Sequence, residues 1–153
     1  MDAEVAARTL YQRLLDGWNA RDAEAMTSVL AADALVVGFD GSQMDGREAA
    51  TSELDRIFAD HEPARYVARI RWVRSQGDDS ALLYAVAGMV APGSSEIMPD
   101  RNAVQTVIAR AGDSWTVALF QTTPAVFDGR PELSEALTAE LNELVPLQPW
   151  PAH

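Results

Sequence analysis

The chain has 153 residues, a net charge of −11 and a pI near 4.4. This acidity disfavours nucleic acids and anionic membrane surfaces as partners, because their phosphate groups would be repelled. There is no cysteine and every basic residue is arginine, which excludes disulfides, thiolate metal sites and lysine Schiff bases. The N-terminus lacks the features of a signal peptide and no apolar run approaches ~18 residues, so we expect a single-domain cytoplasmic protein.

The first part of the chain predicts helices around one strand. Residues 3–20 place apolar side chains at helical spacing, and Asp22 can cap a short helix over 23–31. Residues 34–39 form a β-rich run that ends at a turn. Asp45, with Glu48 three residues later, has the capping-box spacing for a third helix that ends near Asp60.

The second part of the chain changes to strand periodicity. Four long strands are expected over residues 64–75, 80–91, 101–110 and 114–123, separated by short turn signals. A helix over 131–145 and an irregular proline-rich tail follow. The pattern predicts an α+β domain over residues 1–130, with the helix and tail of 131–153 attached to it.

Several stretches resemble a known family: WNARDAEAM, FDGSQMDGREA, the Gln105-Thr106 pair before VIARAGDSW, and TVALFQTTP. Together they resemble the SgcJ/EcaC family of the nuclear transport factor 2-like (SnoaL-like) superfamily, over roughly residues 3–127. The resemblance implies a cystatin-like cone, in which N-terminal helices pack on a strongly curved antiparallel sheet. The family is associated with natural-product clusters, including enediyne polyketide biosynthesis. Thr122 stands where the family pattern has asparagine, so a hydroxyl replaces an amide there.

Placed on the superfamily frame, the chain offers seven candidate pocket residues: Tyr11, Trp18, Asp40, His61, Gln105, Gln121 and Thr122. Tyr11 and Trp18 also fit simple core packing on the helix stripe. Gln105 and Gln121 lie on otherwise apolar strand faces, where an amide is costly unless it is hydrogen-bonded. They either bond each other across the sheet or present their amides to a ligand.

Acid–base chemistry points to Asp40 and His61. An apolar pocket would raise the pKa of Asp40 toward neutrality, and histidine is the side chain best matched to proton transfer near pH 7. Tyr11, Gln105 or Gln121 would then orient an oxyanion. The alternatives are that Asp40 only forms a turn and that His61 only caps a helix.

The first functional hypothesis is cofactor-independent proton transfer on a polyketide-type or other apolar metabolite, by isomerisation, cyclisation or dehydration. The alternatives are a non-catalytic ligand-binding protein and an accessory dimeric protein. No cofactor is expected, and a metal is not expected because a single internal histidine cannot make a normal zinc site. We expect a homodimer formed through the sheet.

Overall fold

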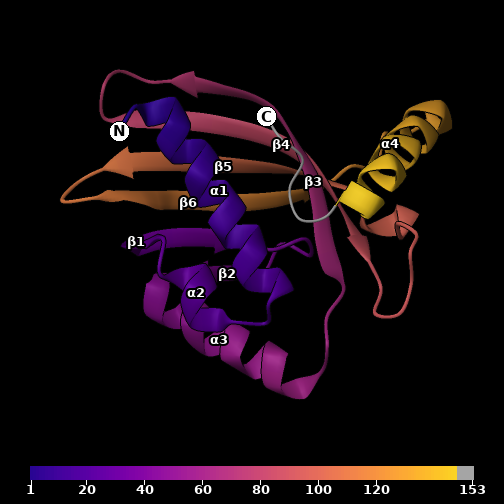
Figure 1. Ribbon diagram of the computed structural model, residues 1–153, viewed down its shortest axis with the longest axis horizontal. Helices are drawn as coiled ribbons and strands as arrows, with labels where there is room; N and C mark the ends of the chain where they lie inside the picture. Colours follow the sequence, from indigo (N-terminus) through magenta and orange to yellow (C-terminus); the bar gives the residue numbers. More distant parts are fainter. Residues whose placement is uncertain (148–153) are drawn as a thin grey trace.

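The computed structural model describes residues 1–147 and shows helices packed against a six-stranded sheet (Figure 1). The helices α1 (Ala3–Asn19), α2 (Ala23–Thr27) and α3 (Arg47–Asp60) precede most of the sheet, and α4 (Pro131–Leu144) follows it. The strands are β1 (Leu30–Val37), β2 (Gln43–Asp45), β3 (Arg65–Ser75), β4 (Ser80–Val90), β5 (Ala103–Ala111) and β6 (Trp115–Pro124). The predicted α+β class is confirmed. The end of the proline-rich tail, residues 148–153, lies outside the described residues.

The sheet has the order β2-β1-β6-β5-β4-β3. Strands β3 to β6 form the predicted antiparallel meander, but β1 joins its edge by pairing parallel to β6, with Val36 beside Phe120. Strand β2 was not predicted. It contains Asp45, so the predicted helix cap is wrong: Gly46 is the N-cap of α3, and no side chain caps the helix. The φ of 97° at Gly46 favours glycine at this tight entry.

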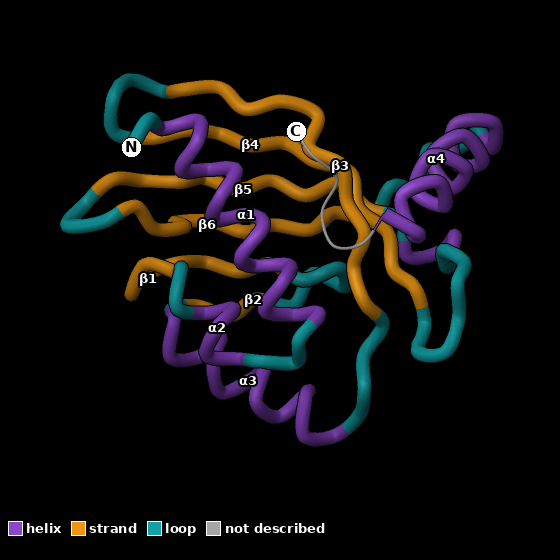
Figure 2. The backbone as a smooth tube through the Cα atoms, viewed as in Figure 1, coloured by secondary structure: helices purple, strands orange, loops and turns teal. Residues whose placement is uncertain are grey.

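The sheet is strongly curved, as the bend of β3 shows in Figure 2. A register shift between Ile70 and Trp72 of β3, and another between Ile108 and Ala109 of β5, mark irregularities in the ladders. Bulges of this kind bend a strand and increase its local twist. The curvature creates a concave face that wraps around α1 and a convex face on the opposite side.

Helix α1 lies across the concave face and supplies much of the main core. Its stripe of Leu10, Tyr11, Leu14 and Leu15 is buried because the apolar residues recur every three or four positions. At Gly17 the helix approaches α2 so closely that a Cβ atom would lie 2.6 Å from Met26 Cα. The missing side chain therefore sets how α1 and α2 meet.

Helix α4 packs on the convex face, where it forms a second apolar cluster. Three of its leucines are buried against β3 and β4 with Ile97: Leu137, Leu141 and Leu144. Glu140 forms ion pairs with Arg69 (2.9 Å) and Arg71 (2.6 Å) on β3. Burial and charge pairing together hold α4 against the same sheet that carries α1 on its other side. Within residues 1–147, no helix is long and apolar enough to cross a membrane.

Candidate functional site

Three of the predicted site residues meet in the interior, between α1 and the concave face. Tyr11 of α1 is fully buried, and its hydroxyl donates a hydrogen bond to Gln105 Oε1 at 2.6 Å. Gln105, fully buried on β5, donates from Nε2 to Thr122 Oγ1 of β6 at 3.1 Å. Of the two alternatives for the glutamines, a bond between Gln105 and Gln121 does not form, because the register places Thr122, not Gln121, opposite Gln105.

A fourth residue of this group, Tyr66 at the start of β3, was missed in the sequence. Burial raises the pKa of its hydroxyl to about 12, while the neighbouring side chains of Gln105 and Thr122 lower it. The residue keeps some exposure, but its hydroxyl is enclosed. Tyr66 lies two residues before Ala68 on the same strand, so both side chains point to the face that contacts α1. This spacing could be read from the sequence. We call Tyr11, Tyr66, Gln105 and Thr122 the interior network.

The backbone of Tyr66 is held by α1. Asn19, at the end of the helix, accepts from Tyr66 N at 2.7 Å and donates to Tyr66 O at 3.0 Å. This side-chain amide satisfies backbone groups on the outer edge of β3, which has no further strand beside it. The middle and the C-terminal end of α1 thus both contribute to the interior network: Tyr11 supplies a hydroxyl and Asn19 positions a second tyrosine.

The interior network is uncharged at neutral pH. Burial raises the pKa of Tyr11 well above its ordinary value, with a smaller contribution from Tyr66. Both phenols therefore stay protonated and act as hydrogen-bonding groups rather than as bases. The network can bind a neutral oxygen or nitrogen group, but it carries no carboxylate or imidazole.

Aromatic side chains surround the interior network. Trp18 of α1 packs edge-on against Phe58 at 5.3 Å between ring centroids and lies 5.5 Å from the Tyr66 ring. Its indole Nε1 donates to Ala64 O at 2.8 Å. On the other side, the Tyr11 ring meets Phe120 at 6.4 Å. Trp18 was a predicted site residue, and the structure places it beside Tyr66.

A pocket of about 190 Å³ adjoins the outer side of Trp18. It is lined by the end of α1, the segment before β3 and the loop after β4: Trp18, Asn19, Arg21, Glu62, Pro63, Ala64, Arg65, Val90, Ala91, Pro92, Gly93 and Ser94. A second, more open pocket lies around residues 126–135, away from the interior network. Trp18 lines the first pocket and packs against the Tyr66 ring, so it lies between this pocket and the interior network.

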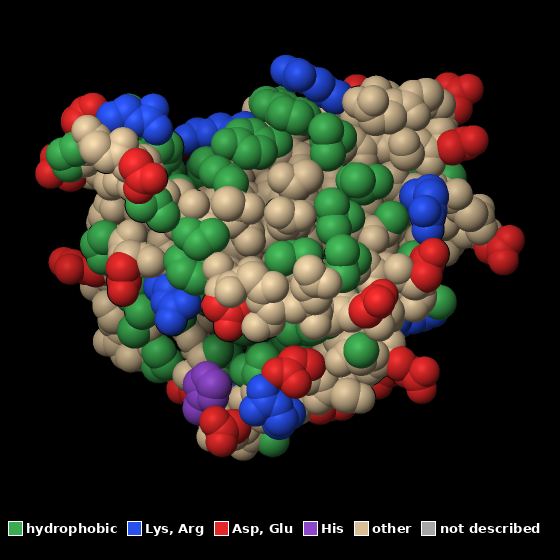
Figure 3. All heavy atoms as spheres, turned by 180° about the vertical axis from the view of Figure 1, so that it is seen from behind, with side chains coloured by type: hydrophobic (Ala, Val, Ile, Leu, Met, Phe, Trp, Pro, Cys, Tyr) green, Lys and Arg blue, Asp and Glu red, His purple; other side chains and the backbone are tan. Residues whose placement is uncertain are grey.

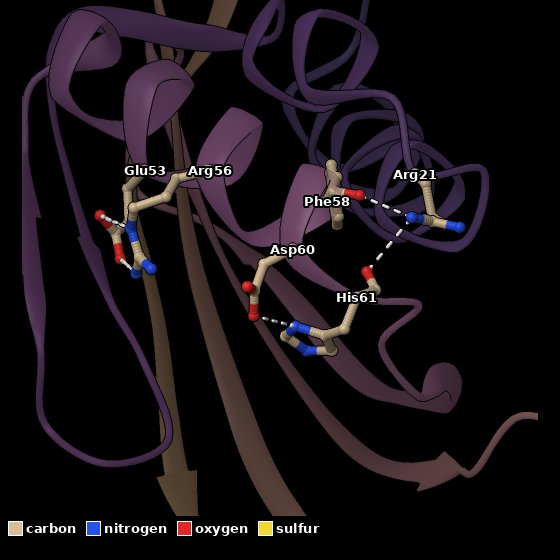
Figure 4. A network of polar contacts seen from close by, with 6 residues as sticks. All are labelled: Arg21, Glu53, Arg56, Phe58, Asp60 and His61. Carbon is tan, nitrogen blue, oxygen red and sulfur yellow. Dashed lines mark hydrogen bonds and ion pairs between the residues drawn. The ribbon is translucent and has the colours of Figure 1, made fainter.

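The two predicted acid–base residues lie outside this group and face solvent. Asp40 occupies the turn after β1, where the Ser42 backbone N–H donates to its carboxylate at 2.9 Å and lowers the carboxyl pKa. His61 is the C-cap residue of α3, with Nδ1 3.2 Å from Asp60 Oδ2 (Figure 4). Neither side chain has the apolar surroundings that the acid–base hypothesis required. Gln121 is exposed as well.

Arg21 fastens the end of α3 near His61. Its guanidinium donates to Phe58 O and to His61 O at 3.2 Å, as Figure 4 shows. The carbonyls at a helix C-terminus lack partners within the helix, so this arginine satisfies groups that would otherwise need water. Arg21, which itself adopts a φ of 55°, thus contributes to the end of α3 together with its C-cap residue His61.

Comparison with known proteins agrees with this architecture. A family model described as a SnoaL-like domain matches residues 11–118, more than half of the chain. The chain belongs to the SnoaL-like domain family. The matched range includes three members of the interior network, while Thr122 and α4 follow it. No curated protein sequence matches the chain.

Solved structures share the fold at low sequence identity. A cystatin-like domain of unknown function from Nostoc punctiforme PCC 73102 superimposes with a TM-score of 0.77 at 21% identity, covering 94% of this chain and 92% of its own. A ketosteroid isomerase-like protein from Erwinia carotovora atroseptica SCRI1043 has a TM-score of 0.60 at 14% identity, with 80% and 95% covered. A type 2 hexachlorocyclohexane dehydrochlorinase has a TM-score of 0.65 at 15% identity, with 79% and 84% covered. These likenesses establish the cystatin-like, NTF2-like fold.

The hydrogen bond between Tyr11 and Gln105 can be measured by a double-mutant cycle. We expect Tyr11→Phe to lower the free energy of unfolding by about 1–3 kcal/mol, because it removes the donor at a buried amide oxygen. Gln105→Leu and the double variant complete the cycle, and the two effects should be non-additive by about 1 kcal/mol. Urea unfolding measures all three. Tyr84→Phe, on the half-buried convex face, is the control; an effect of Tyr11→Phe no larger than that of Tyr84→Phe would contradict the interaction.

Proposed function

We propose that this protein binds a small, largely apolar molecule against the concave face and holds one of its oxygen atoms on the interior network. One observation carries the proposal: hydrogen-bonding side chains from α1, β3, β5 and β6 converge in an otherwise apolar interior. Concave apolar sites with a few converging polar groups are the usual form of ligand sites. Binding without acid–base catalysis fits best, because both members of the expected acid–base pair are exposed.

The ligand would enter past Trp18. The pocket beside this indole measures about 190 Å³, below the roughly 300–1,000 Å³ of typical ligand sites. A ligand that reaches the Tyr66 hydroxyl from this pocket has to turn the Trp18 ring aside or occupy space that the ring now fills. The indole is fixed by one hydrogen bond to Ala64 O and by ring contacts, which a bound aromatic or alicyclic body can replace.

A matched pair of ligands tests the role of the interior network. 1-Tetralone and tetralin differ by one carbonyl oxygen, and each can be titrated against bound N-phenyl-1-naphthylamine by fluorescence. We expect the affinity for tetralone to be about five-fold higher than that for tetralin, which corresponds to one hydrogen bond of about 1 kcal/mol. Thr122→Val and Gln105→Leu should remove this preference, while Tyr84→Phe should keep it. Equal displacement by both compounds in the wild-type protein would refute the proposal.

Proton transfer next to a carbonyl is the second candidate. It is favoured by the positive charge of Arg101, which acts to lower the pKa of both Asp40, in the turn after β1, and Tyr66, in the interior network. Proteins of the same fold are described as ketosteroid isomerase-like and as a dehydrochlorinase, and the resemblance to the SgcJ/EcaC family suggests a polyketide-type substrate. The same probe separates the candidates. Accelerated exchange of the α-hydrogens of 1-tetralone in D₂O, lost in Asp40→Asn, would favour catalysis over binding alone.

We also propose that a second copy of the chain covers the part of the convex face that α4 leaves open. Hydrophobic side chains gather over this face in Figure 3. The half-buried apolar residues there are Trp72, Leu82, Tyr84, Ile108 and Leu119. The rings of Trp72 and Tyr84 lie 5.5 Å apart, and the Arg74 guanidinium covers Trp72 at 4.2 Å.

Sedimentation at micromolar concentration tests the dimer. We expect a wild-type dimer and a folded Ile108→Arg monomer, because a charge at the centre of the face would be buried without a partner. Val126→Arg, on an exposed loop, should leave the dimer intact. A wild-type monomer at about 100 μM would contradict the proposal.

A further inference from the structure

Arg101 places a positive charge at the end of the sheet where the interior network lies. It ends the 3-10 turn η1 (Pro99–Arg101), just before β5. Its guanidinium carbon lies 5.0 Å from the centroid of the Phe39 ring, which follows β1. The same charge favours the ionised forms of Asp40 and Tyr66, residues of two further segments. Arg101 therefore stands at the rim of the concave face, beyond the end of β5 nearer to Gln105 and beside the turn after β1.

The Arg101 guanidinium has no carboxylate within ion-pair distance in the part of the chain that the structure describes. The ion pairs of arginines there involve Arg56, Arg69, Arg71 and Arg110. Asp40 is the acidic group that Arg101 acts on, but its carboxylate is hydrogen-bonded to the Ser42 backbone and remains beyond 4.0 Å. In a chain of net charge −11, this leaves an exposed guanidinium that lies over the face of the Phe39 ring.

The backbone that carries Arg101 is held in place from two sides. Arg101 N donates to Met98 O at 3.0 Å, and Ala125 N donates to Asn102 O at 2.9 Å. The Asn102 side chain is buried and donates to Thr138 Oγ1 of α4 at 2.8 Å. Helix α4 and the end of β6 thus fix the segment next to Arg101. A charge on a fixed segment loses less entropy when it binds an anion than one on a mobile loop.

We propose that the ligand of the concave site carries a carboxylate, sulfonate or similar oxyanion on its apolar body, and that Arg101 pairs with this group. The inference rests on the proposed binding function and names the class of molecule that it selects. An oxyanion can accept charge-assisted hydrogen bonds from the guanidinium while the apolar body lies along Phe39 toward the interior network. Asp40 opposes the same group by repulsion.

Two dyes with the same ring system test the role of Arg101. 1-Anilinonaphthalene-8-sulfonate carries a sulfonate, and N-phenyl-1-naphthylamine lacks it. In fluorescence titrations, we expect Arg101→Gln to weaken binding of the sulfonate dye about five- to ten-fold and to change the affinity for the neutral dye less than two-fold. Arg101→Lys should retain most of the affinity for the sulfonate dye, and Asp40→Asn should increase that affinity about two-fold.

The matched control is Arg74→Gln, which removes an exposed guanidinium above Trp72 on the convex face. This variant should bind both dyes as the wild type does. If it weakens the sulfonate dye, the anion binds on the convex face and the proposal is wrong. The proposal also fails if Arg101→Gln affects both dyes equally or neither, although binding of the neutral dye would then leave the proposed function standing. If neither dye binds, both fail together.

Discussion

The arrangement of this molecule depends on one buried amide. Gln105 lies on the apolar face of β5 with no exposed surface, so its oxygen and nitrogen must find partners inside the protein. Tyr11 supplies a donor from α1, and Thr122 supplies an acceptor from β6. Leaving such a group unpaired would cost about 1–3 kcal/mol, a large share of the stability of a small domain. The amide therefore specifies how α1 lies on the sheet.

The interior network and the rim offer different interactions to a ligand. Inside, two protonated phenols, an amide and a hydroxyl offer neutral hydrogen bonds in a low-dielectric setting, where each bond is electrostatically stronger than in water. At the rim, Asp40 and Arg101 are charged and exposed. A molecule with an apolar body, one neutral oxygen and one charged end would match both regions. Helix α4 contributes indirectly, because it fixes the segment that carries Arg101.

Much of this arrangement could be predicted from local sequence patterns. The helical spacing around Tyr11 identified both α1 and its buried stripe, and the two-residue period of the strands placed Gln105 on an apolar face. The period does not determine how strands align with each other. It therefore could not reveal that Thr122, and not Gln121, lies opposite Gln105.

The remaining misses concern loops and helix ends. Whether Asp40 and His61 face a pocket depends on the path of the chain after β1 and after α3, which no periodicity describes. Arg101 was expected at the start of a strand, but Pro99 begins a 3-10 turn that directs it to the rim. The face of β3 on which Tyr66 lies could be predicted from the strand period. Its role becomes visible only when the curved sheet brings β3, β5 and β6 together.

The central claim is that the interior network forms the floor of a ligand site, and side-chain NMR signals test it most directly. In a titration with N-phenyl-1-naphthylamine, the account predicts that the Gln105 side-chain amide and the Trp18 indole N–H shift. The Gln121 amide and the Trp72 indole, which lie away from the network, should stay in place. Shifts confined to Gln121 and Trp72 would place the ligand on the convex face and contradict the account.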